Sequence, residues 1–174
     1  MRKHGLPPVV DRNTRVLILG SLPGDRSLAR QEYYAHPRNL FWHLVGVVTG
    51  CDLAGQPYAD RLSSLLGKGI GMWDVIGSGR RSGSLDAAIR EPHLNPLTDL
   101  IGTLPHLRAV AFNGKTAARA GERILADAGV PLVALPSSSP AYAAMPLATK
   151  EKHWLDLKEY LGRENLETPR ARDH

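Results

Sequence analysis

Apolar residues gather in short runs along the chain, and each run is bounded by glycine, proline or polar residues. Such runs are typical of buried strands, and they cover residues 15–20, 69–76, 107–114 and 130–136. Other segments repeat their apolar side chains at helical spacing, which predicts helices. These segments span residues 39–49, 58–69, 95–104, 115–128 and 149–162. Strands that alternate with helices predict an α/β fold whose parallel sheet is covered on both faces.

The remaining segments are polar or rich in glycine and proline. Residues 1–14 contain paired prolines, and we expect a lead-in segment there. Residues 77–84, GSGRRSGS, predict an exposed flexible loop. Residues 163–174 are charged and lack apolar periodicity, so we expect a flexible tail. Because no repeat or linker divides the rest, residues 1–162 are expected to form a single domain.

The balance of charge favours a polyanionic partner without establishing one. The chain has 22 Lys and Arg against 17 Asp and Glu, which gives a net charge of +5 at pH 7. Such an excess fits nucleic acid, but an arginine-rich composition with no special partner explains it equally well. The single cysteine, Cys51, excludes an internal disulfide, a cysteine zinc site and a four-cysteine iron–sulfur cluster.

The hydropathy pattern gives no sign of a membrane protein. No stretch approaches the roughly 18 consecutive apolar residues that a membrane-spanning helix requires. The start of the chain, MRKHGLPPVV, also lacks the apolar region of a signal peptide. We therefore expect a soluble, cytoplasmic monomer without a membrane partner.

Loops that follow strands are the segments where open parallel sheets bind ligands. GSLPG at residues 20–24 lets the backbone approach a ligand closely, because glycine has no side chain. It lacks the GxGxxG spacing of a dinucleotide site, and Leu22 replaces the serine of a GxSxG hydrolase motif. NGKT at residues 113–116 resembles the end of a P-loop, but Ala109 replaces its first glycine, which excludes an NTPase.

The segment YYAHPRNLFW at residues 33–42 is the most informative of these loops. Aromatic side chains can stack on a nucleobase, and Arg38 can bind phosphate. His36 is equally explained as a turn residue, and Asn39 as the N-cap of a helix. Asn113 can read a base edge or simply suit a strand-to-helix turn. The hydroxyl-rich loop at residues 135–143 can clamp phosphates or be a plain surface loop.

The order of these motifs resembles the uracil-DNA glycosylase superfamily, and most closely its hypoxanthine-DNA glycosylase branch, family six. The motifs run from GSLPG through YYAHPRNLFW, GIGMWDVI, RRSGSLDAAI and FNGKTA to LPSSSPA, within residues 15–160. The resemblance implies a three-layer α/β/α fold with a central four-stranded parallel sheet. It also implies an enzyme that flips a damaged base out of duplex DNA and hydrolyses its N-glycosidic bond.

The resemblance also assigns roles to particular residues. Tyr34 matches the aromatic residue that stacks on the flipped base, and Asn39 matches an asparagine proposed as catalytic in the hypoxanthine branch. The residues expected to bind the base are Gly20, Ser21, Leu22, Pro23, Gly24, Tyr34, His36 and Asn113. The residues expected to contact DNA are Arg38, Arg80, Arg81, Lys115, Ser137, Ser138, Ser139, Pro140 and Ala141.

The chain departs from the related branches at two positions. Leu22 stands where the mismatch-specific branch has a catalytic asparagine, and Leu135 where the uracil branch has a histidine. Both differences make Asn39 the stronger candidate for the catalytic residue. Its carbonyl can orient an attacking water. Lys115 is expected to contact phosphate rather than to act as a lyase nucleophile. We therefore expect a monofunctional glycosylase for a deaminated base, above all hypoxanthine, that needs no metal and no cofactor.

Other functions stay open at this point. A uracil or G:T/U mismatch-specific DNA glycosylase would share the motifs. A non-catalytic nucleic-acid-binding module would use the same tyrosines and basic loops, and it would bind DNA without releasing a base. A hydrolase of free nucleosides would cleave inosine itself, although it would not need the basic RRSGS segment.

Overall fold

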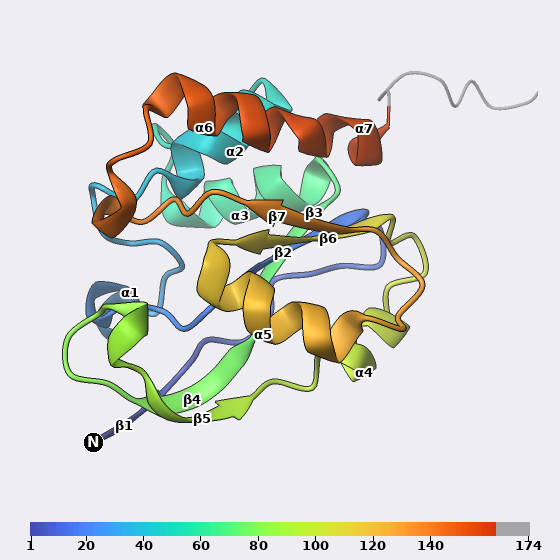
Figure 1. The fold of residues 1–174 in the computed structure, drawn as a ribbon. Coiled ribbons are helices and arrows are strands. Elements are labelled where there is room, and N and C mark those ends of the chain that lie inside the picture. Colours follow the sequence, from blue (N-terminus) through green and yellow to red (C-terminus); the bar gives the residue numbers. More distant parts are fainter. Residues whose placement is uncertain (163–174) are drawn as a thin grey trace, which may run out of the picture.

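Four parallel strands form the centre of the protein in the computed structural model, which describes residues 1–162 (Figure 1). Their order in the sheet is β3 (Ile70–Asp74), β2 (Val16–Gly20), β6 (Ala109–Asn113) and β7 (Leu132–Leu135). These strands lie within the four predicted apolar runs, which confirms the parallel sheet. The tail expected at residues 163–174 lies outside the described residues.

The strands carry apolar side chains on both faces because both faces of the sheet are covered. Every residue of β2, β3 and β6 is buried, as is usual in parallel sheets. In the register of the sheet, Gly20 is paired with Asp74, and Asn113 with Leu135. The carboxyl ends of the strands therefore meet at one edge, where the loops expected to bind a ligand begin.

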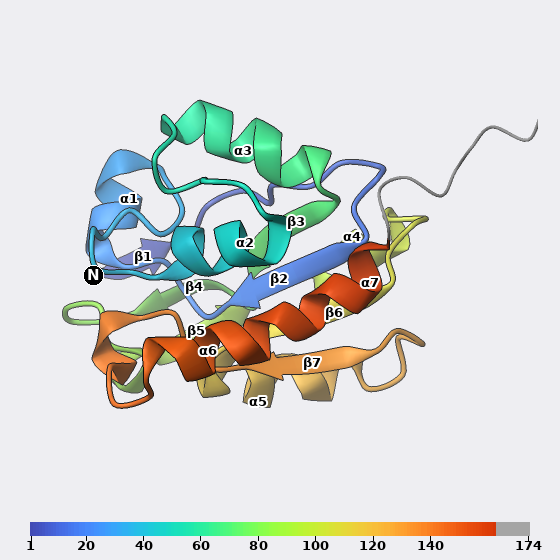
Figure 2. The same ribbon diagram turned by 90° about the horizontal axis from the view of Figure 1, so that it is seen from above.

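Helices form the two outer layers, as the three-layer prediction requires. Figure 1 shows α2 (Phe41–Thr49), α3 (Tyr58–Gly67), α6 (Leu147–Trp154) and α7 (Lys158–Leu161) above the sheet. It shows α4 (Leu97–Gly102) and α5 (Lys115–Leu125) below it. The view from above in Figure 2 confirms that α2 and α6 lie side by side over the strands. No helix of the described residues is both long and apolar enough to cross a membrane.

The helix boundaries differ from the predicted ones near the site. Helix α2 begins at Phe41 and has Leu40 as its N-cap, so Asn39 precedes the cap. The loop GSLPGDRS expected at residues 20–27 is shorter in the structure, because the helix α1 (Asp25–Arg30) begins within it. The predicted closing helix is divided into α6, a 3-10 turn (Leu155–Leu157) and α7.

A second, antiparallel sheet corrects two of the predictions. Its strands are β1 (Arg2–His4), β4 (Ile76–Arg80) and β5 (Arg90–Leu94), in the order β1–β4–β5. The lead-in expected at residues 1–14 therefore contains a strand, and half of the loop expected at residues 77–84 is another. The apolar pattern missed β4 because it is rich in glycine, and the glycines fit close neighbours. A Cβ atom at Gly77 would lie 2.5 Å from Asn95 Oδ1.

The connection between β4 and β5 turns back toward the carboxyl edge of the main sheet. It contains a 3-10 turn (Asp86–Ala88). In Figures 1 and 2 this connection, α1 and the segment that precedes α6 gather at the same end of the molecule. The second sheet thus supplies one wall of the site described next.

Candidate functional site

A cavity of about 630 Å³ opens at the carboxyl edge of the parallel sheet. This volume lies within the usual range for small-molecule and cofactor pockets. The cavity is lined by residues 20–27, 33, 34, 36, 39, 74, 84–87, 113 and 137–142. It therefore brings together the three loops that follow β2, β6 and β7, as the sequence predicts. It also includes part of the RRSGSLDAAI motif in the β4–β5 connection, and Asp74, to which no role was assigned from the sequence.

Gly20 lets two functional side chains enter the floor of the cavity. A Cβ atom at this position would lie 2.6 Å from Asp74 Oδ1 and 2.9 Å from the hydroxyl oxygen of Tyr34. Any larger residue would push one of these groups away. Beside it, the hydroxyl of Ser21 donates a hydrogen bond to Asp86 Oδ1 at 2.6 Å. The GSLPG loop is thus shaped around side chains that face the cavity.

Arg81 lies beneath this loop and not on the surface. Its side chain is buried, and its guanidinium donates hydrogen bonds to the backbone carbonyls of Leu22 and Pro23. The expectation that Arg81 belongs to an exposed basic loop is therefore wrong. A buried charge must be held by such hydrogen bonds, and here they fix the backbone of the pocket floor.

Tyr34 occupies the cavity with one ring face already covered. Its ring stacks on that of Phe41, with centroids 3.8 Å apart and an interplanar angle of 14°. Its backbone has a φ of 53°, an unusual conformation for a tyrosine. Burial, and then the nearby Asp74, raise the pKa of the Tyr34 hydroxyl, which stays neutral. Phe41 thus supports Tyr34 from behind, in a loop whose backbone is strained to present the ring.

Three polar side chains form a hydrogen-bonded network across the ends of β6 and β7. Asn113 Oδ1 accepts from the backbone N–H of Ser138, and Asn113 Nδ2 donates to Ser138 Oγ, both at 2.9 Å. The Ser138 hydroxyl then donates to Asn39 Oδ1 at 2.8 Å. The backbone N–H of Phe41 donates to the same oxygen at 3.0 Å. The backbone N–H of Ser138 can only donate, so the Asn113 amide must point its oxygen at it. The amide nitrogen then donates to the Ser138 hydroxyl, and this hydroxyl is left to donate to Asn39 Oδ1.

The direction of these hydrogen bonds decides which end of the Asn39 amide is available. Its Oδ1 already accepts two hydrogen bonds, which matches the two lone pairs of an amide oxygen. Within residues 1–162, no hydrogen bond engages Asn39 Nδ2. The expectation that the Asn39 carbonyl orients a water is therefore not supported by this network. Asn39 offers the cavity a pair of N–H donors.

The serine loop at residues 137–139 is held from below by a lysine that sequence analysis missed. Lys150 is buried, and its ammonium donates 2.8 Å hydrogen bonds to the carbonyls of Ser137 and Tyr142. Ser138 is fully buried, and Ser139 caps the following 3-10 turn by accepting from the N–H of Ala141. Lys150 stands in a helix with charged neighbours, so nothing in the sequence marks it as buried.

Asp74 is the second residue that sequence analysis missed. It ends β3, the residue is only 4% exposed, and its Oδ2 has no hydrogen-bond partner in the described residues. Burial, and then the nearby Asp86, raise its pKa to about 7, against an opposing effect of Arg81. The available signal was a carboxylate inside an otherwise apolar predicted strand, residues 69–76, because a charged group is seldom buried unless it has a partner or a function.

The basic residues expected to contact DNA lie outside the cavity or at its rim. His36, which was expected to bind the base instead, lines the cavity, and its Nδ1 accepts from the backbone N–H of Arg38 at 3.1 Å. Arg38 and Lys115 are exposed. Arg80 is exposed on β4 and pairs with Glu91 at 3.1 Å. Within residues 1–162, no cluster of three or more His, Cys, Asp or Glu side chains could hold a metal ion.

Comparisons with known proteins agree with one another. The family model of the uracil DNA glycosylase superfamily matches residues 7–161. A hypoxanthine DNA glycosylase of Methanosarcina barkeri is 47% identical over 115 residues, which are 66% of this chain and 73% of the relative. A protein of the same name from Methanosarcina acetivorans is 43% identical over 141 residues, 81% of this chain and 89% of the relative.

A solved structure gives the same result for the fold. The solution NMR structure of a candidate uracil DNA glycosylase from Methanosarcina acetivorans superimposes with a TM-score of 0.83 at 39% identity. The match covers 92% of this chain and 99% of that chain.

Proposed function

Because the chain belongs to the uracil DNA glycosylase superfamily, as its motifs indicated, we propose that this DNA glycosylase removes hypoxanthine from deoxyinosine in DNA. Two relatives at 43–47% identity carry the name hypoxanthine DNA glycosylase, which supports that choice of base. The single observation that carries the proposal is the cavity itself. It presents the aromatic ring of Tyr34, which Phe41 supports, and the free amide N–H donors of Asn39.

The reaction that these groups can assist is a hydrolysis. Water forms a bond to C1′ of the sugar, and the electron pair of the bond from C1′ to N9 departs with the purine. The proton that the water loses ends on the released purine. As the bond to N9 breaks, negative charge develops on the base, and N–H donors held in place stabilise such charge. We assign this role to Asn39 Nδ2, because the network through Ser138 fixes the amide with its nitrogen available. Tyr34 stacks on the flipped base through the face that Phe41 leaves open.

The remaining predicted residues fit a surface that positions DNA. The floor residues 20–24, together with His36 and Asn113, enclose the flipped base. Ser137, Ser139, Pro140 and Ala141, in the loop that Lys150 holds in place, bind the backbone beside it. Ser138 has no part in this contact, because it is fully buried and its N–H, carbonyl and hydroxyl bond within the protein. Arg38, Arg80 and Lys115 neutralise phosphates, and such contacts position a protein without reading the sequence. Arg81 has no part in these contacts, because it is buried under the pocket floor.

Base release from defined duplexes tests the proposal. Matched duplexes that carry one hypoxanthine, uracil, xanthine or G·T mismatch are incubated with excess enzyme, and free bases are quantified by chromatography. We expect free hypoxanthine and an intact abasic strand until alkali is added, because the mechanism is monofunctional. Faster release of uracil under the same conditions would overturn the choice of base. Binding without release would favour a non-catalytic module, and cleavage of free inosine would favour a nucleoside hydrolase.

A further inference from the structure

Asp74 combines three properties that a structural carboxylate seldom combines. It lines the cavity, the residue is 4% exposed, and its Oδ2 is buried without a hydrogen-bond partner among the described residues. A buried polar group without a partner costs free energy, so such a group calls for an explanation. Gly20 has no side chain, and this leaves room for the Asp74 carboxyl to reach the cavity.

The protonation state of such a carboxyl decides which base edge it can bind. A carboxylate only accepts hydrogen bonds, whereas a protonated carboxyl donates one and accepts another. Deamination of adenine or cytosine places a carbonyl next to a ring N–H, which is a lactam. A protonated carboxyl pairs with a lactam through two hydrogen bonds, while adenine presents an amino group beside a bare ring nitrogen.

We propose that Asp74 is a specificity-determining residue of this pocket and that its protonated carboxyl recognises the lactam edge of a deaminated base. This inference rests on the proposed function and deepens it. The carboxyl accepts from the ring N–H of hypoxanthine and donates to the neighbouring carbonyl. No bond is formed or broken at Asp74, and its proton stays on the carboxyl throughout recognition.

The surroundings of Asp74 favour the protonated state. Tyr33 and Tyr34, Arg81 and Asp86 are the ionisable groups that face it from the neighbouring segments. Burial acts most strongly and Asp86 acts in the same direction, whereas Arg81 opposes them, and the resulting pKa is about 7. The tyrosines stay neutral because burial, and then the charge of Asp74, raise their pKa values. Arg81 is meanwhile engaged by the carbonyls of Leu22 and Pro23.

The test compares Asp74→Asn with Asp74→Ala, because an amide keeps one donor and one acceptor but does not titrate. Single-turnover excision of hypoxanthine is measured from pH 5.5 to 8.5 on one duplex. We expect Asp74→Ala to be slower than wild type by roughly 10- to 100-fold at pH 6, as two hydrogen bonds are lost. Asp74→Asn should recover most of that loss. The wild-type rate, divided by that of Asp74→Asn, should fall as pH rises through about 7.

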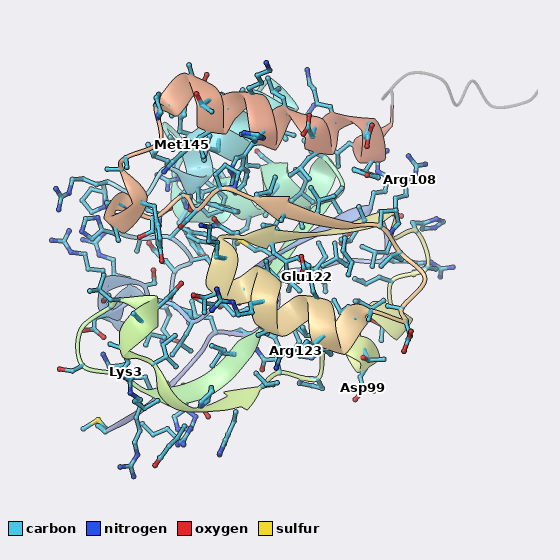
Figure 3. The ribbon with its side chains drawn as sticks, viewed as in Figure 1. Lys3, Asp99, Arg108, Glu122, Arg123 and Met145 are labelled. Carbon is cyan, nitrogen blue, oxygen red and sulfur yellow. The ribbon has the colours of Figure 1, made fainter. Side chains whose placement is uncertain are left out.

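A matched control and a fold check accompany these variants. Asp99→Asn changes an exposed carboxylate on α4, far from the cavity, and should leave both rate and pH profile unchanged (Figure 3). Circular dichroism at each pH verifies that the variants are folded. Because both rates use one substrate, the ionisation of the substrate cancels in their ratio.

Three outcomes would overturn the inference. If Asp74→Ala excises at the wild-type rate, Asp74 does not contact the base. If Asp74→Asn is as slow as Asp74→Ala and the wild-type rate rises through pH 7, Asp74 is an ionised carboxylate that activates the attacking water. If the wild type releases neither hypoxanthine nor uracil nor xanthine, the proposed function fails together with the inference. Release of uracil alone would reject hypoxanthine but still test Asp74, because uracil is also a lactam.

Discussion

The two walls of the cavity differ in how far their polar groups are satisfied within the protein. The amide wall, formed by Asn39, Asn113 and Ser138, is tied together by hydrogen bonds of one fixed direction. The acidic wall, formed by Asp74 and Asp86, has a buried carboxylate oxygen with no partner in the described residues. A satisfied network holds its groups rigidly, whereas an unsatisfied group is available to a ligand. The proposed roles follow this difference, with catalysis at the amide wall and base selection at the acidic wall.

The largest expected effect comes from the amide wall. Asn39→Asp keeps an oxygen for the N–H of Phe41 and the hydroxyl of Ser138, but it removes both N–H donors. We expect turnover to fall on the order of 100- to 1000-fold, the range for loss of one preorganised donor. Single-turnover excision measures this change.

Asn39→Ser and a binding assay separate the catalytic role from a structural one. Serine preserves a hydroxyl oxygen near the start of α2, so the protein should stay folded while excision is lost. DNA binding should persist in both variants, because the phosphate contacts lie elsewhere. Near-wild-type excision by folded Asn39→Asp would show that Asn39 only organises the loop.

The next effect concerns the aromatic group that both walls enclose. Tyr34→Ala should weaken productive binding by about 1–3 kcal/mol, the value for loss of one base–aromatic stack. Tyr34→Phe should keep most of the activity, because the ring and its contact with Phe41 are retained. Equilibrium binding to a duplex with an uncleavable deoxyinosine analogue measures the difference. Equal losses in both variants would instead assign the effect to the hydroxyl.

Lys150 tests whether the amide wall depends on support from beneath. Lys150→Met retains the length of the side chain and removes the hydrogen bonds to the carbonyls of Ser137 and Tyr142. Leaving buried carbonyls unsatisfied costs about 1–3 kcal/mol, and the lower end applies here because these carbonyls are only partly buried. We expect a lower melting temperature and a higher KM for DNA. An unchanged KM in a destabilised variant would show that the serine loop keeps its shape without Lys150.

The raised pKa of Asp74 in the acidic wall should also make the free energy of unfolding depend on pH. Between the ordinary pKa of 3.8 and the raised value of about 7, the folded protein holds a proton on Asp74 that the unfolded chain releases. The free energy of unfolding therefore falls as pH rises through this window. Asp74→Asn lacks this dependence, so its melting temperature relative to wild type should increase between pH 5 and pH 8. A difference that stays constant with pH would contradict the raised pKa.

The smallest effects concern two adjacent arginines that the sequence could not tell apart. Arg80→Ala should lower the salt dependence of binding, since each phosphate contact contributes about 0.9 to the slope of log affinity against log salt. Arg81→Ala should instead destabilise the protein, because Arg81 holds the carbonyls of Leu22 and Pro23. Salt titrations and thermal melts distinguish the two. A lower salt slope for folded Arg81→Ala would show that Arg81 contacts a DNA phosphate.

Sequence predicted the central sheet well because its strands are apolar on both faces, as in the run at residues 15–20. It predicted β4 wrongly because glycine and serine interrupt the apolar pattern of a strand that is mostly buried. The cavity loops could be predicted because strand ends meet at one edge of a parallel sheet. The sequence could not predict which end of the Asn39 amide is free. That depends on a hydrogen bond from Ser138, which is 99 positions away in the chain.

Single-turnover release of hypoxanthine by wild type and Asn39→Asp, measured side by side on one deoxyinosine duplex, decides whether the N–H groups of Asn39 assist catalysis. We expect free hypoxanthine from the wild-type enzyme. We expect release slower on the order of 100-fold or more from a folded Asn39→Asp protein that still binds the duplex. No release by the wild type would overturn the proposed function, and equal release by both proteins would show that Asn39 is not catalytic.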